Sequence, residues 1–481
     1  MYIKLIQPKM RRRPMDTDIK LHMSPPLGLL TIAAMLRNDH RVVIENENIE
    51  RIHFDDKPDI VGISVTVDTL PRAMEISKEF RARRSIVVAG GIHITTATAF
   101  VPKDAFDVLC VGAAEGTWLD IVRDAERGEL KPVYRCKPDL CGAEIVPPAY
   151  DMLKKGKYLY CNVIHTSRGC PFRCDFCYNS SSERRYIKRE IPDVIAEIKA
   201  LGTDHVMFID DNLAGDPKWT REFLHAIKPL DLRWQAAVSI NATKDEELLD
   251  LMKESGCRSL FIGFESITPE SVSGVHKVQN SAADYDAAVR AIHDRGIMIN
   301  ASFVFGLDGD MPATFDATLD WIVRNRIETV TSHILTPYPG TVLYERMKAE
   351  GRITTDDLSL YNTANVVFKP SGMTADELYD GYINIYKRIY SLKNIIRRLP
   401  AAKDQRAGYL LFNLLYRKYG KLTDVLCKIV SYRLIGRLAE IWSALSRRCR
   451  ACPSGRDQPT RLDRASVTLD PEINLMSAHQ P

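Results

Sequence analysis

Three cysteines lie close together in residues 168–178 (RGCPFRCDFCY), at Cys170, Cys174 and Cys177. Thiolates ligate iron–sulfur clusters, which usually take four of them, so three on one loop leave one iron of a 4Fe–4S cluster open to another ligand. Zinc is the alternative metal, but zinc sites add a second cysteine pair or histidines at matching spacing. None follows here, so the spacing predicts a 4Fe–4S cluster with one open position.

The same residues resemble the cysteine motif of the radical S-adenosylmethionine (SAM) superfamily, in which an aromatic residue, here Phe176, precedes the third cysteine. The resemblance implies that the amino and carboxylate groups of SAM bind the open iron. It also implies reductive cleavage of the sulfonium to a methionine fragment and a 5′-deoxyadenosyl radical. The cofactors supply this chemistry, while the protein supplies position and exclusion of water.

Composition limits the other functions open to the chain. Its 481 residues suggest two to four domains, and the formal net charge of +4 gives no support for general nucleic-acid binding. Eleven cysteines indicate reduced thiols rather than a secreted disulfide framework. No signal-peptide core stands at the start, and no apolar run approaches the roughly 20 residues of a membrane span. We expect a cytoplasmic protein without a transmembrane segment.

Residues 1–127 alternate apolar runs with helical patterns, which favours a flavodoxin-like, doubly wound parallel sheet of five strands. Ligands bind such sheets at the carboxyl ends of the strands, where glycines would let a large flat ligand approach the backbone. The predicted strands are Tyr2–Ile6, Val42–Ile44, Ile60–Val65, Ile86–Ala89 and Val108–Val111.

This segment resembles the cobalamin-binding domain that is fused to many radical SAM enzymes, through residues 25–30 (PPLGLL), 58–64 (PDIVGIS) and 90–93 (GGIH). The D-x-H-x-x-G sequence that supplies a cobalt ligand elsewhere is absent, which leaves loss of cobalamin as an alternative. We expect His93 to cap a helix or to be hydrogen-bonded rather than to ligate cobalt. The residues that the resemblance assigns to cobalamin are Ser64, Thr66, Gly90, Gly91, His93 and Glu115.

Residues 128–157 read as a linker rich in proline and glycine, and residues 158–352 as the radical SAM core domain. Six strand–helix units in order predict a partial, TIM-like (β/α)6 barrel, whose chemistry would lie on the loops after its strands. The predicted strands are Cys161–Thr166, His205–Ile209, Trp234–Val238, Ser259–Phe264, Met298–Val304 and Thr331–Leu335. The cysteine loop follows the first of them.

Polar groups follow the other strands of this series. The resemblance places Asp210 or Asp211 on the amine of SAM and Ser239 on its carboxylate. It places Glu265 on the ribose hydroxyls and the backbone at Gly306 on the adenine edge. It also assigns Phe176, Tyr178 and Pro337 to the SAM site. Any one of these, Asp211 and Ser239 in particular, could instead be a helix N-cap.

After residue 352 the pattern becomes helical, with a domain over residues 353–446 and helices expected at Ala375–Tyr390, Tyr409–Tyr419 and Thr423–Leu445. The last is interpreted as a core-facing helix, with a basic membrane-surface helix as the alternative. The polar tail, residues 447–481, is expected to be disordered. Its Cys449 and Cys452 are either idle thiols or ligands for a soft ion.

The resemblance therefore implies a cobalamin-dependent radical SAM methyltransferase that acts on an unactivated carbon in secondary metabolism. In that family methylcobalamin supplies the methyl group, and a second SAM remethylates cobalt. One alternative is transfer of the 3-amino-3-carboxypropyl group of SAM to a soft acceptor such as trivalent arsenic, as in the arsinothricin pathway. A non-enzymatic cobalamin-binding protein is another. Expected partners are a small-molecule substrate and a reductant such as flavodoxin or ferredoxin, without nucleic acid. The catalytic residues and the substrate stay open.

Overall fold

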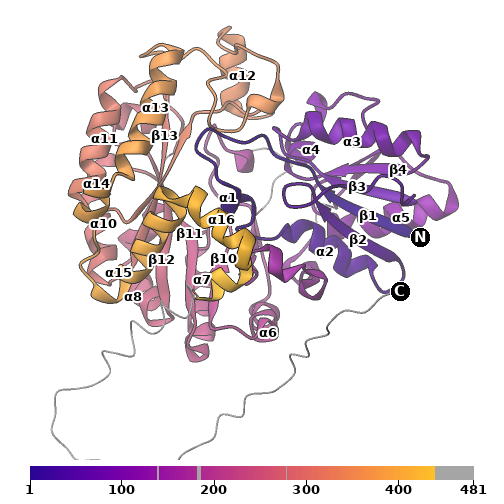
Figure 1. Ribbon diagram of the computed structural model, residues 1–481, viewed down its shortest axis with the longest axis horizontal. Coiled ribbons are helices and arrows are strands. Elements are labelled where there is room, and N and C mark those ends of the chain that lie inside the picture. The colour runs from indigo at the N-terminus through magenta and orange to yellow at the C-terminus, as the bar shows by residue number, and fades with distance from the viewer. Residues whose placement is uncertain (138–139, 181–185, 278, 439–481) are drawn as a thin grey trace, which may run out of the picture.

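The computed structural model describes residues 1–137, 140–180, 186–277 and 279–438. Two parallel six-stranded sheets form the centres of two lobes that lie side by side (Figure 1). The segment between the first strand and α2 (Leu27–Leu36), which includes α1 (Asp18–Leu21), runs from the N-terminal lobe across to the second lobe (Figure 1). The chain is therefore an α/β protein whose two sheets are tied together by its own N-terminal segment.

The N-terminal sheet has the strand order β2-β1-β3-β4-β5-β6, all parallel. Helices α2 and α5 (Trp118–Arg127) pack on one face, and α3 (Leu70–Ala82) and α4 (Ile92–Thr96) on the other. Because both faces are covered, the strands are continuous apolar runs, as the flavodoxin-like prediction requires. The strands are β1 (Tyr2–Gln7), β2 (Arg41–Asn46), β3 (Ile60–Ser64), β4 (Ile86–Gly90), β5 (Val108–Val111) and β6 (Val133–Arg135).

The sixth strand corrects the prediction of an irregular linker at its start. Strand β6 pairs in parallel with β5, and Tyr134 is buried between two exposed neighbours. The phenol of Tyr134 donates a hydrogen bond of 2.8 Å to Asp124 in α5. Proline is tolerated beside an edge strand, where one side of the backbone pairs with nothing. Pro132 therefore led to the prediction of a linker at a place where tertiary packing stabilises a strand.

The second sheet has the order β14-β13-β12-β11-β10-β7, again all parallel, with α6 to α12 on its outer side. This arrangement confirms the predicted partial barrel of six strand–helix units. A short antiparallel pair, β8 (Ser167–Arg168) with β9 (Ile187–Lys188), was not predicted and flanks the cysteine loop. The strands are β7 (Val163–Ile164), β10 (His205–Phe208), β11 (Arg233–Val238), β12 (Cys257–Glu265), β13 (Met298–Phe305) and β14 (Thr329–Ile334).

One helix follows each barrel strand, as six strand–helix units predict, and the short α9, which precedes α10, was not predicted. Five of these seven helices have a proline in the first turn or a side chain that caps it, which matches the usual preference there. Asp216 and Thr341, for example, accept hydrogen bonds from the first turns of α7 and α12. The helices are α6 (Ile191–Leu201), α7 (Pro217–Ile227), α8 (Glu246–Glu254), α9 (Pro269–Ser273), α10 (Tyr285–Asp294), α11 (Ala313–Arg324) and α12 (Val342–Ala349).

The C-terminal helices close the side of the barrel beside β14. Helix α13 (Ala375–Ile389) confirms its prediction, and α14 (Leu392–Arg397), α15 (Arg406–Leu410), the π-helix η12 (Leu411–Lys418) and α16 (Gly420–Val430) follow. The prediction of one helix over Thr423–Leu445 is wrong in its described part, because the helix breaks at Ser431 (φ 148°) and resumes at residues 432–438. No helix in the described part of the chain has the length and apolarity that a membrane crossing needs.

Candidate functional site

The cysteine loop leaves the short β8 strand through Gly169, whose φ of 79° is in the left-handed region that glycine adopts freely. Two amide side chains point at its sulfurs. The Nδ2 of Asn212 lies 4.0 Å from Sγ of Cys170, and the Nε2 of Gln279 donates to Sγ of Cys174 at 3.5 Å. N–H donors of this kind stabilise sulfur that carries negative charge, as in cluster-bound thiolates.

Burial holds these thiols in the neutral form when they are free. It raises the pKa of Cys177 to about 11 and also raises the pKa of Cys170 and Cys174. Neighbouring thiols add to the rise at Cys170 and Cys177, and the charges of nearby carboxylates add to it at Cys174. A cationic cluster would reverse that preference. Among the described residues no group of His, Cys, Asp or Glu side chains is tight enough to hold a single ion. Three thiolates on one loop fit a 4Fe–4S cluster, in which each would bind a different iron.

Asp210, at the end of β10, ties this loop to the barrel. Its Oδ1 accepts hydrogen bonds from the backbone N–H and the hydroxyl of both Thr166 and Ser167, three of them 2.7–3.0 Å long. Its Oδ2 is buried without a partner, and burial raises its pKa to about 6. Asp210 thus positions the chain that enters the cysteine loop, and one carboxylate oxygen is left for another donor.

The next two strand ends hold polar pairs. The hydroxyl of Ser239 accepts a 2.6 Å hydrogen bond from Nδ2 of Asn212, and its backbone N–H donates to Oδ1 of the same side chain. Ser239 occupies the N-cap position of the short 3-10 helix η8 (Ile240–Lys244), but its hydroxyl makes no capping bond there. Glu265, at a φ of 64°, pairs with Lys277, whose Nζ also donates to the carbonyl of Gly263 at 2.9 Å.

The remaining predicted SAM residues lie at the same end of the barrel. Asp211 is close enough for its charge to raise the pKa of Cys170 and Cys177. Tyr178 stacks on Tyr338 with ring centroids 4.4 Å apart. The N–H of Gly306 donates to the buried Asp310 at 3.0 Å. Phe176 packs against the barrel core, and Pro337 is buried beside Tyr338 in the loop that follows β14.

Sequence reasoning missed four residues of this site. Asn212 could have been predicted as a site residue, because it follows Asp210 and Asp211 at a strand end. The sequence did not indicate that its side chain would reach Ser239 at the next strand end. Gln279 and Lys277 carry no local signal, because they follow α9 rather than a strand. Asp310 lies four residues beyond Gly306 and binds back to it. Only the tertiary fold brings these four to the cysteine loop and its neighbours.

The carboxyl end of the N-terminal sheet is formed mainly by backbone. Gly91 has a φ of 102°, and a Cβ there would lie 2.9 Å from the backbone N and O of Val65. Ser64, Thr66 and Gly90 belong to the same edge. The residues present fit a large planar ligand, because the strand ends offer backbone and small side chains.

His93 follows this edge in α4 and contradicts the expectation of a capping or hydrogen-bonded residue. It is fully buried, and neither ring nitrogen has a hydrogen-bond partner. Burial lowers its pKa to about 4, so the imidazole is neutral at pH 7. A buried imidazole without partners is costly in a folded protein. His93 is therefore the polar group on this edge that most requires a ligand.

Three contacts join the two strand ends. Glu115, which follows β5, forms a bidentate ion pair with Arg168, the last residue of β8, with oxygen–nitrogen distances of 2.7 and 2.5 Å. A Cβ on Gly340, in the loop after β14, would lie 2.2 Å from the carbonyl of Thr96 in α4. The charge of Asp68, after β3, raises the pKa of Tyr178 and Tyr338. The carboxyl ends of the two sheets thus face each other.

Comparisons with known proteins agree with this architecture. The model of the B12 binding domain matches residues 22–122, that of the radical SAM superfamily residues 164–322, and that of a domain of unknown function (DUF4070) residues 341–406. The bacteriochlorophyllide d C-12(1)-methyltransferase of Chlorobaculum tepidum is 30% identical over 87% of this chain and 93% of its own. The hopanoid C-2 methylase of Rhodopseudomonas palustris is 28% identical over 72% of this chain and 68% of its own.

Among solved structures, the cobalamin-dependent SAM radical enzyme OxsB with aqua-cobalamin bound has a similar fold, with a TM-score of 0.63 and 15% identity over 87% of this chain and 72% of that one. The class that fold and site define is a radical SAM enzyme with a second, cobalamin-type domain. The chain belongs to the family of cobalamin-binding radical SAM enzymes. Its cofactors are a 4Fe–4S cluster, SAM and cobalamin, so the alternative of a lost cobalamin is not supported.

Proposed function

We propose that this enzyme is a cobalamin-dependent radical SAM methyltransferase that acts on an unactivated carbon of a small molecule in secondary metabolism. The observation that supports it best is the facing of the two strand ends, held by Glu115 with Arg168 and by Gly340 against Thr96. A methyl donor on one edge and a radical source on the other require one substrate between them. The names of the curated relatives, among them two bacteriochlorophyllide methyltransferases and a hopanoid methylase, agree with methyl transfer.

The residues at each edge take distinct roles in this proposal. Cys170, Cys174 and Cys177 hold the cluster, and Asn212 and Gln279 orient its thiolates. With SAM bound, the cluster supplies the electron that opens the sulfonium. The free Oδ2 of Asp210 is placed to accept from the SAM ammonium. The proposed SAM site also contains Phe176, Tyr178, Asp211, Ser239, Glu265, Gly306 and Pro337.

On the other edge, we assign Ser64, Thr66, Gly90, Gly91 and His93 to cobalamin. Gly91 keeps the backbone bare, and His93 offers a buried neutral imidazole to a polar edge of the ligand. Glu115 was expected on cobalamin as well, but both its carboxylate oxygens are engaged by Arg168. We therefore assign Glu115 to positioning the cysteine loop against the cobalamin domain.

The two alternatives have no supporting observation. The arsinothricin-type reading depends on Cys449 and Cys452, which lie outside the described residues. Three curated relatives, which match this chain over 406 to 432 residues, are named as methyltransferases rather than as aminocarboxypropyl transferases. A non-enzymatic carrier is not consistent with membership of an enzyme family.

The test is an anaerobic incubation of the reconstituted enzyme with SAM and a low-potential reductant, either dithionite or reduced flavodoxin, with and without hydroxocobalamin. Mass analysis should find 5′-deoxyadenosine, and with substrate S-adenosylhomocysteine and a methylated product only when cobalamin is present. Methylthioadenosine as the main product would instead indicate cleavage of the other carbon–sulfur bond. No SAM cleavage under these conditions would defeat the proposed function.

A further inference from the structure

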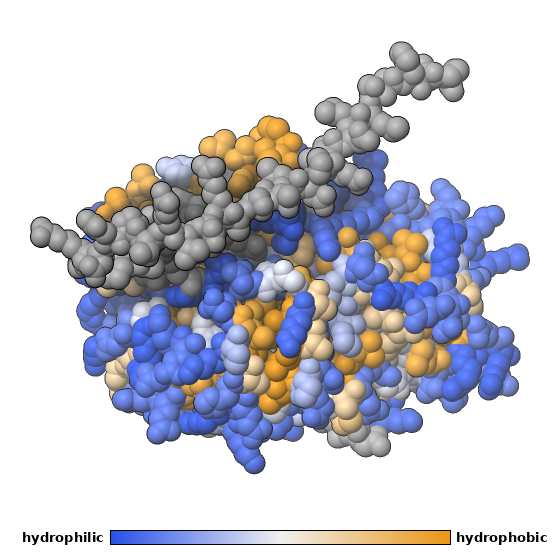
Figure 2. Space-filling view, turned by 90° about the horizontal axis from the view of Figure 1, so that it is seen from below, coloured by the Kyte–Doolittle hydropathy of each residue, from blue (hydrophilic) through white to orange (hydrophobic). Residues whose placement is uncertain are grey.

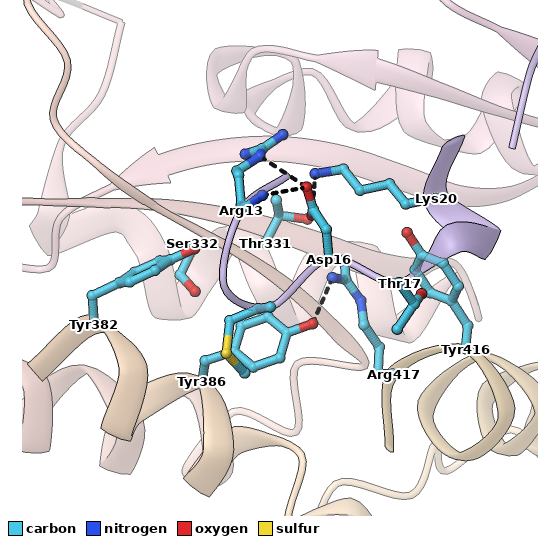
Figure 3. A pocket seen from close by; sticks show the side chains of 11 residues that line it. Arg13, Asp16, Thr17, Lys20, Thr331, Ser332, Tyr382, Tyr386, Tyr416 and Arg417 are labelled. Atoms are coloured by element: carbon cyan, nitrogen blue, oxygen red, sulfur yellow. Dashed lines mark hydrogen bonds and ion pairs between the residues drawn. The ribbon is translucent and has the colours of Figure 1, made fainter. Parts of the chain in front are cut away.

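A polar cavity lies beside β14, the edge strand of the open barrel, where the chain's first and last segments meet (Figure 3). It measures about 40 Å³, whereas roughly 10–15 Å³ is enough for one water. There is room for a carboxylate or a phosphate-sized group. The lining residues come from the segment before and within α1, from β14, from α13 and from η12: Arg13, Met15, Asp16, Thr17, Lys20, Thr331, Ser332, Tyr382, Tyr386, Tyr416 and Arg417.

Positive charge exceeds negative charge in this cavity. Asp16 is the only carboxylate among the lining residues, and it bridges two cations: its Oδ1 accepts from Lys20 at 2.7 Å, and its Oδ2 lies 3.5 Å from Nε of Arg13. Arg417 adds a third cation, whose Nη1 donates to the phenol of Tyr386 at 2.9 Å (Figure 3). Three cations share one carboxylate, which leaves a net charge of about +2 in a half-buried space.

Two donors on the cavity wall have no partner. The Nε of Arg417 and the Oγ of Ser332 are both buried without a hydrogen bond in the described structure. Tyr386 and Tyr416 hold the guanidinium in place by their ring faces, 5.8 and 4.9 Å from its carbon. A guanidinium with a rigid position, a free N–H and a free hydroxyl beside it is the donor set that carboxylates and phosphates prefer.

The cavity is connected to the reactive end of the barrel through charge. Burial raises the pKa of Asp68, and the positive charges of Arg13 and Lys20 act against this rise. The charge of Asp68 in turn acts on Tyr178 and Tyr338 beside the cysteine loop. Arg13 also donates to the hydroxyl of Thr363 at 2.7 Å, and the same hydroxyl bonds the ring of His333 in β14. A molecule held here would lie along the open edge of the barrel.

We propose that this cavity binds the anionic end, a carboxylate or a phosphate, of an organic substrate. The proposal rests on the proposed function, because it assumes that the substrate enters the open side of the barrel. It adds a substrate class to it: an acidic molecule whose reacting carbon lies away from its charged group. Arg13, Lys20, Arg417 and Ser332 are then specificity-determining residues.

The probes are sulfate and propionate, titrated by calorimetry into the reconstituted full-length enzyme. Arg13→Gln removes a cavity cation, and Ser332→Ala removes a small donor without leaving a large void. Arg12→Gln is the matched control, because Arg12 is exposed in the same segment and pairs outside the cavity with Asp18. We expect Arg13→Gln to lower the affinity for both anions at least tenfold and Ser332→Ala to lower it about threefold. Arg12→Gln should leave the affinity unchanged.

A pH series sharpens this test. Burial, with the charge of Arg13, lowers the pKa of Lys20 to about 8. Sulfate does not titrate near this pH, so its affinity should be full below pH 8 and fall as Lys20 loses its proton above it. Asp16, Arg13 and Arg417 also line the cavity around Lys20, and so do the phenols of Tyr382, Tyr386 and Tyr416, whose pKa burial raises. Lys20→Met should remove the pH step.

The outcomes separate this proposal from the proposed function. Equal affinities in wild type, Arg13→Gln and Ser332→Ala would overturn the cavity as an anion site. Binding of sulfate but not propionate would assign it to a free inorganic ion and overturn the substrate class. A wild-type enzyme that binds both anions but never cleaves SAM would defeat the proposed function and leave the anion site standing.

A second observation, independent of the first, concerns the outer face of the C-terminal helices. The inward face of α16 buries Thr423, Asp424 and Cys427, while its outward face carries Leu422 at 71% and Ile429 at 77% exposure. The exposed face is therefore more apolar than that of an ordinary surface helix. In Figure 2 hydrophobic side chains gather along the upper rim of the molecule. The exposed apolar residues here are Leu415, Tyr419, Leu422, Val425, Leu426, Ile429, Val430, Leu434 and Leu438.

We infer that this face docks on an anionic membrane surface. Lys418, Lys421 and Arg437 are exposed among the apolar residues, and the only acidic side chain in residues 405–438 is the buried Asp424. Apolar side chains rimmed by cations are typical of helices that lie in the lipid interface. A group of exposed apolar side chains of this kind is typical of an interaction site.

Sedimentation of the full-length protein with vesicles tests this inference. Phosphatidylglycerol–phosphatidylcholine vesicles should bind it, pure phosphatidylcholine should bind it at least tenfold more weakly, and Leu422→Glu/Ile429→Glu should abolish binding. Ile396→Glu is the matched control, an isoleucine of 64% exposure on α14. Failure of the wild type to sediment would overturn the inference, and so would a dimer that the double variant disrupts, since the face would then join two copies.

Discussion

The two parallel sheets of this enzyme present different kinds of groups at the carboxyl ends of their strands. The N-terminal sheet ends in glycines and small side chains, and its conspicuous polar group, His93, is buried without a partner. The barrel sheet ends in side chains that bind one another: Asp210 to Thr166 and Ser167, Asn212 to Ser239, and Glu265 to Lys277. The edge of the N-terminal sheet exposes its backbone, whereas the edge of the barrel sheet carries side chains that are already hydrogen-bonded to one another.

The difference follows from the ligands. A large macrocycle needs area and close backbone approach, so the cobalamin edge excludes side chains. A cluster and SAM need a few fixed contacts, so the barrel edge positions donors and acceptors before they bind. If this comparison holds, the barrel edge should be sensitive to loss of single functional groups. The cobalamin edge should be sensitive to addition of atoms.

The largest effect is expected from the cysteines. Replacing Cys170, Cys174 or Cys177 by Ala removes a cluster ligand, and each variant should lose the iron–sulfur absorbance and SAM cleavage completely. Cys141→Ala is the control, because Cys141 is exposed and outside the loop, and it should behave as wild type. Three single variants that retain cluster and cleavage would contradict the assignment of the loop.

Adding atoms to the cobalamin edge should come next. Gly91→Val forces a β-branched residue to a φ of 102° with backbone atoms 2.9 Å from its Cβ, at a cost of about 3 kcal/mol or more. Cobalamin should no longer be retained through gel filtration, while the cluster absorbance persists. Gly28→Ala has nothing within 4 Å of the new Cβ and should leave retention unchanged. Retention by the valine variant would break the comparison.

The ion pair between the two edges gives a smaller effect. Glu115→Gln leaves Arg168 with a neutral partner in a half-buried setting and should lower the free energy of unfolding by about 1–3 kcal/mol. Glu79→Gln removes a solvent-exposed partner of Arg83 and should cost less than about 1 kcal/mol. Urea unfolding measures both. If Glu115→Gln lowers the free energy of unfolding no more than Glu79→Gln does, the contact between Glu115 and Arg168 does not stabilise the arrangement of the two lobes.

The smallest effect concerns pH. The pKa of His93 falls from 6.5 when exposed to about 4 when buried, so the unfolded chain binds its proton first and stability is lost as pH falls below 6.5. From pH 6.5 to 4.5 this amounts to about 2 kcal/mol. His93→Leu should flatten that part of the acid limb in unfolding measured across this range. An unchanged acid limb would mean that His93 is protonated or hydrated in the fold.

Much of this molecule was predictable because its signals are local. The cysteine spacing, the apolar runs of parallel strands and the helical periods each lie within a few residues, and the strands and helices formed much as predicted. The six barrel strands and the helix Ala375–Ile389 show this. Strand β6 and the break at Ser431 were missed, because three residues beside a proline and a single backbone angle depend on what packs against them.

The sequence by itself determined the chemistry: three thiolates on one loop, glycines at one set of strand ends and carboxylates at the other. Only the tertiary structure decided which groups meet. It paired Glu115 with Arg168 across 53 residues and brought Gln279 to Cys174. It also closed Arg13 and Arg417 around one cavity from opposite ends of the chain. The physical reason is that a hydrogen bond or an ion pair acts over a few ångströms in space, and local sequence carries no record of which distant segment will lie there.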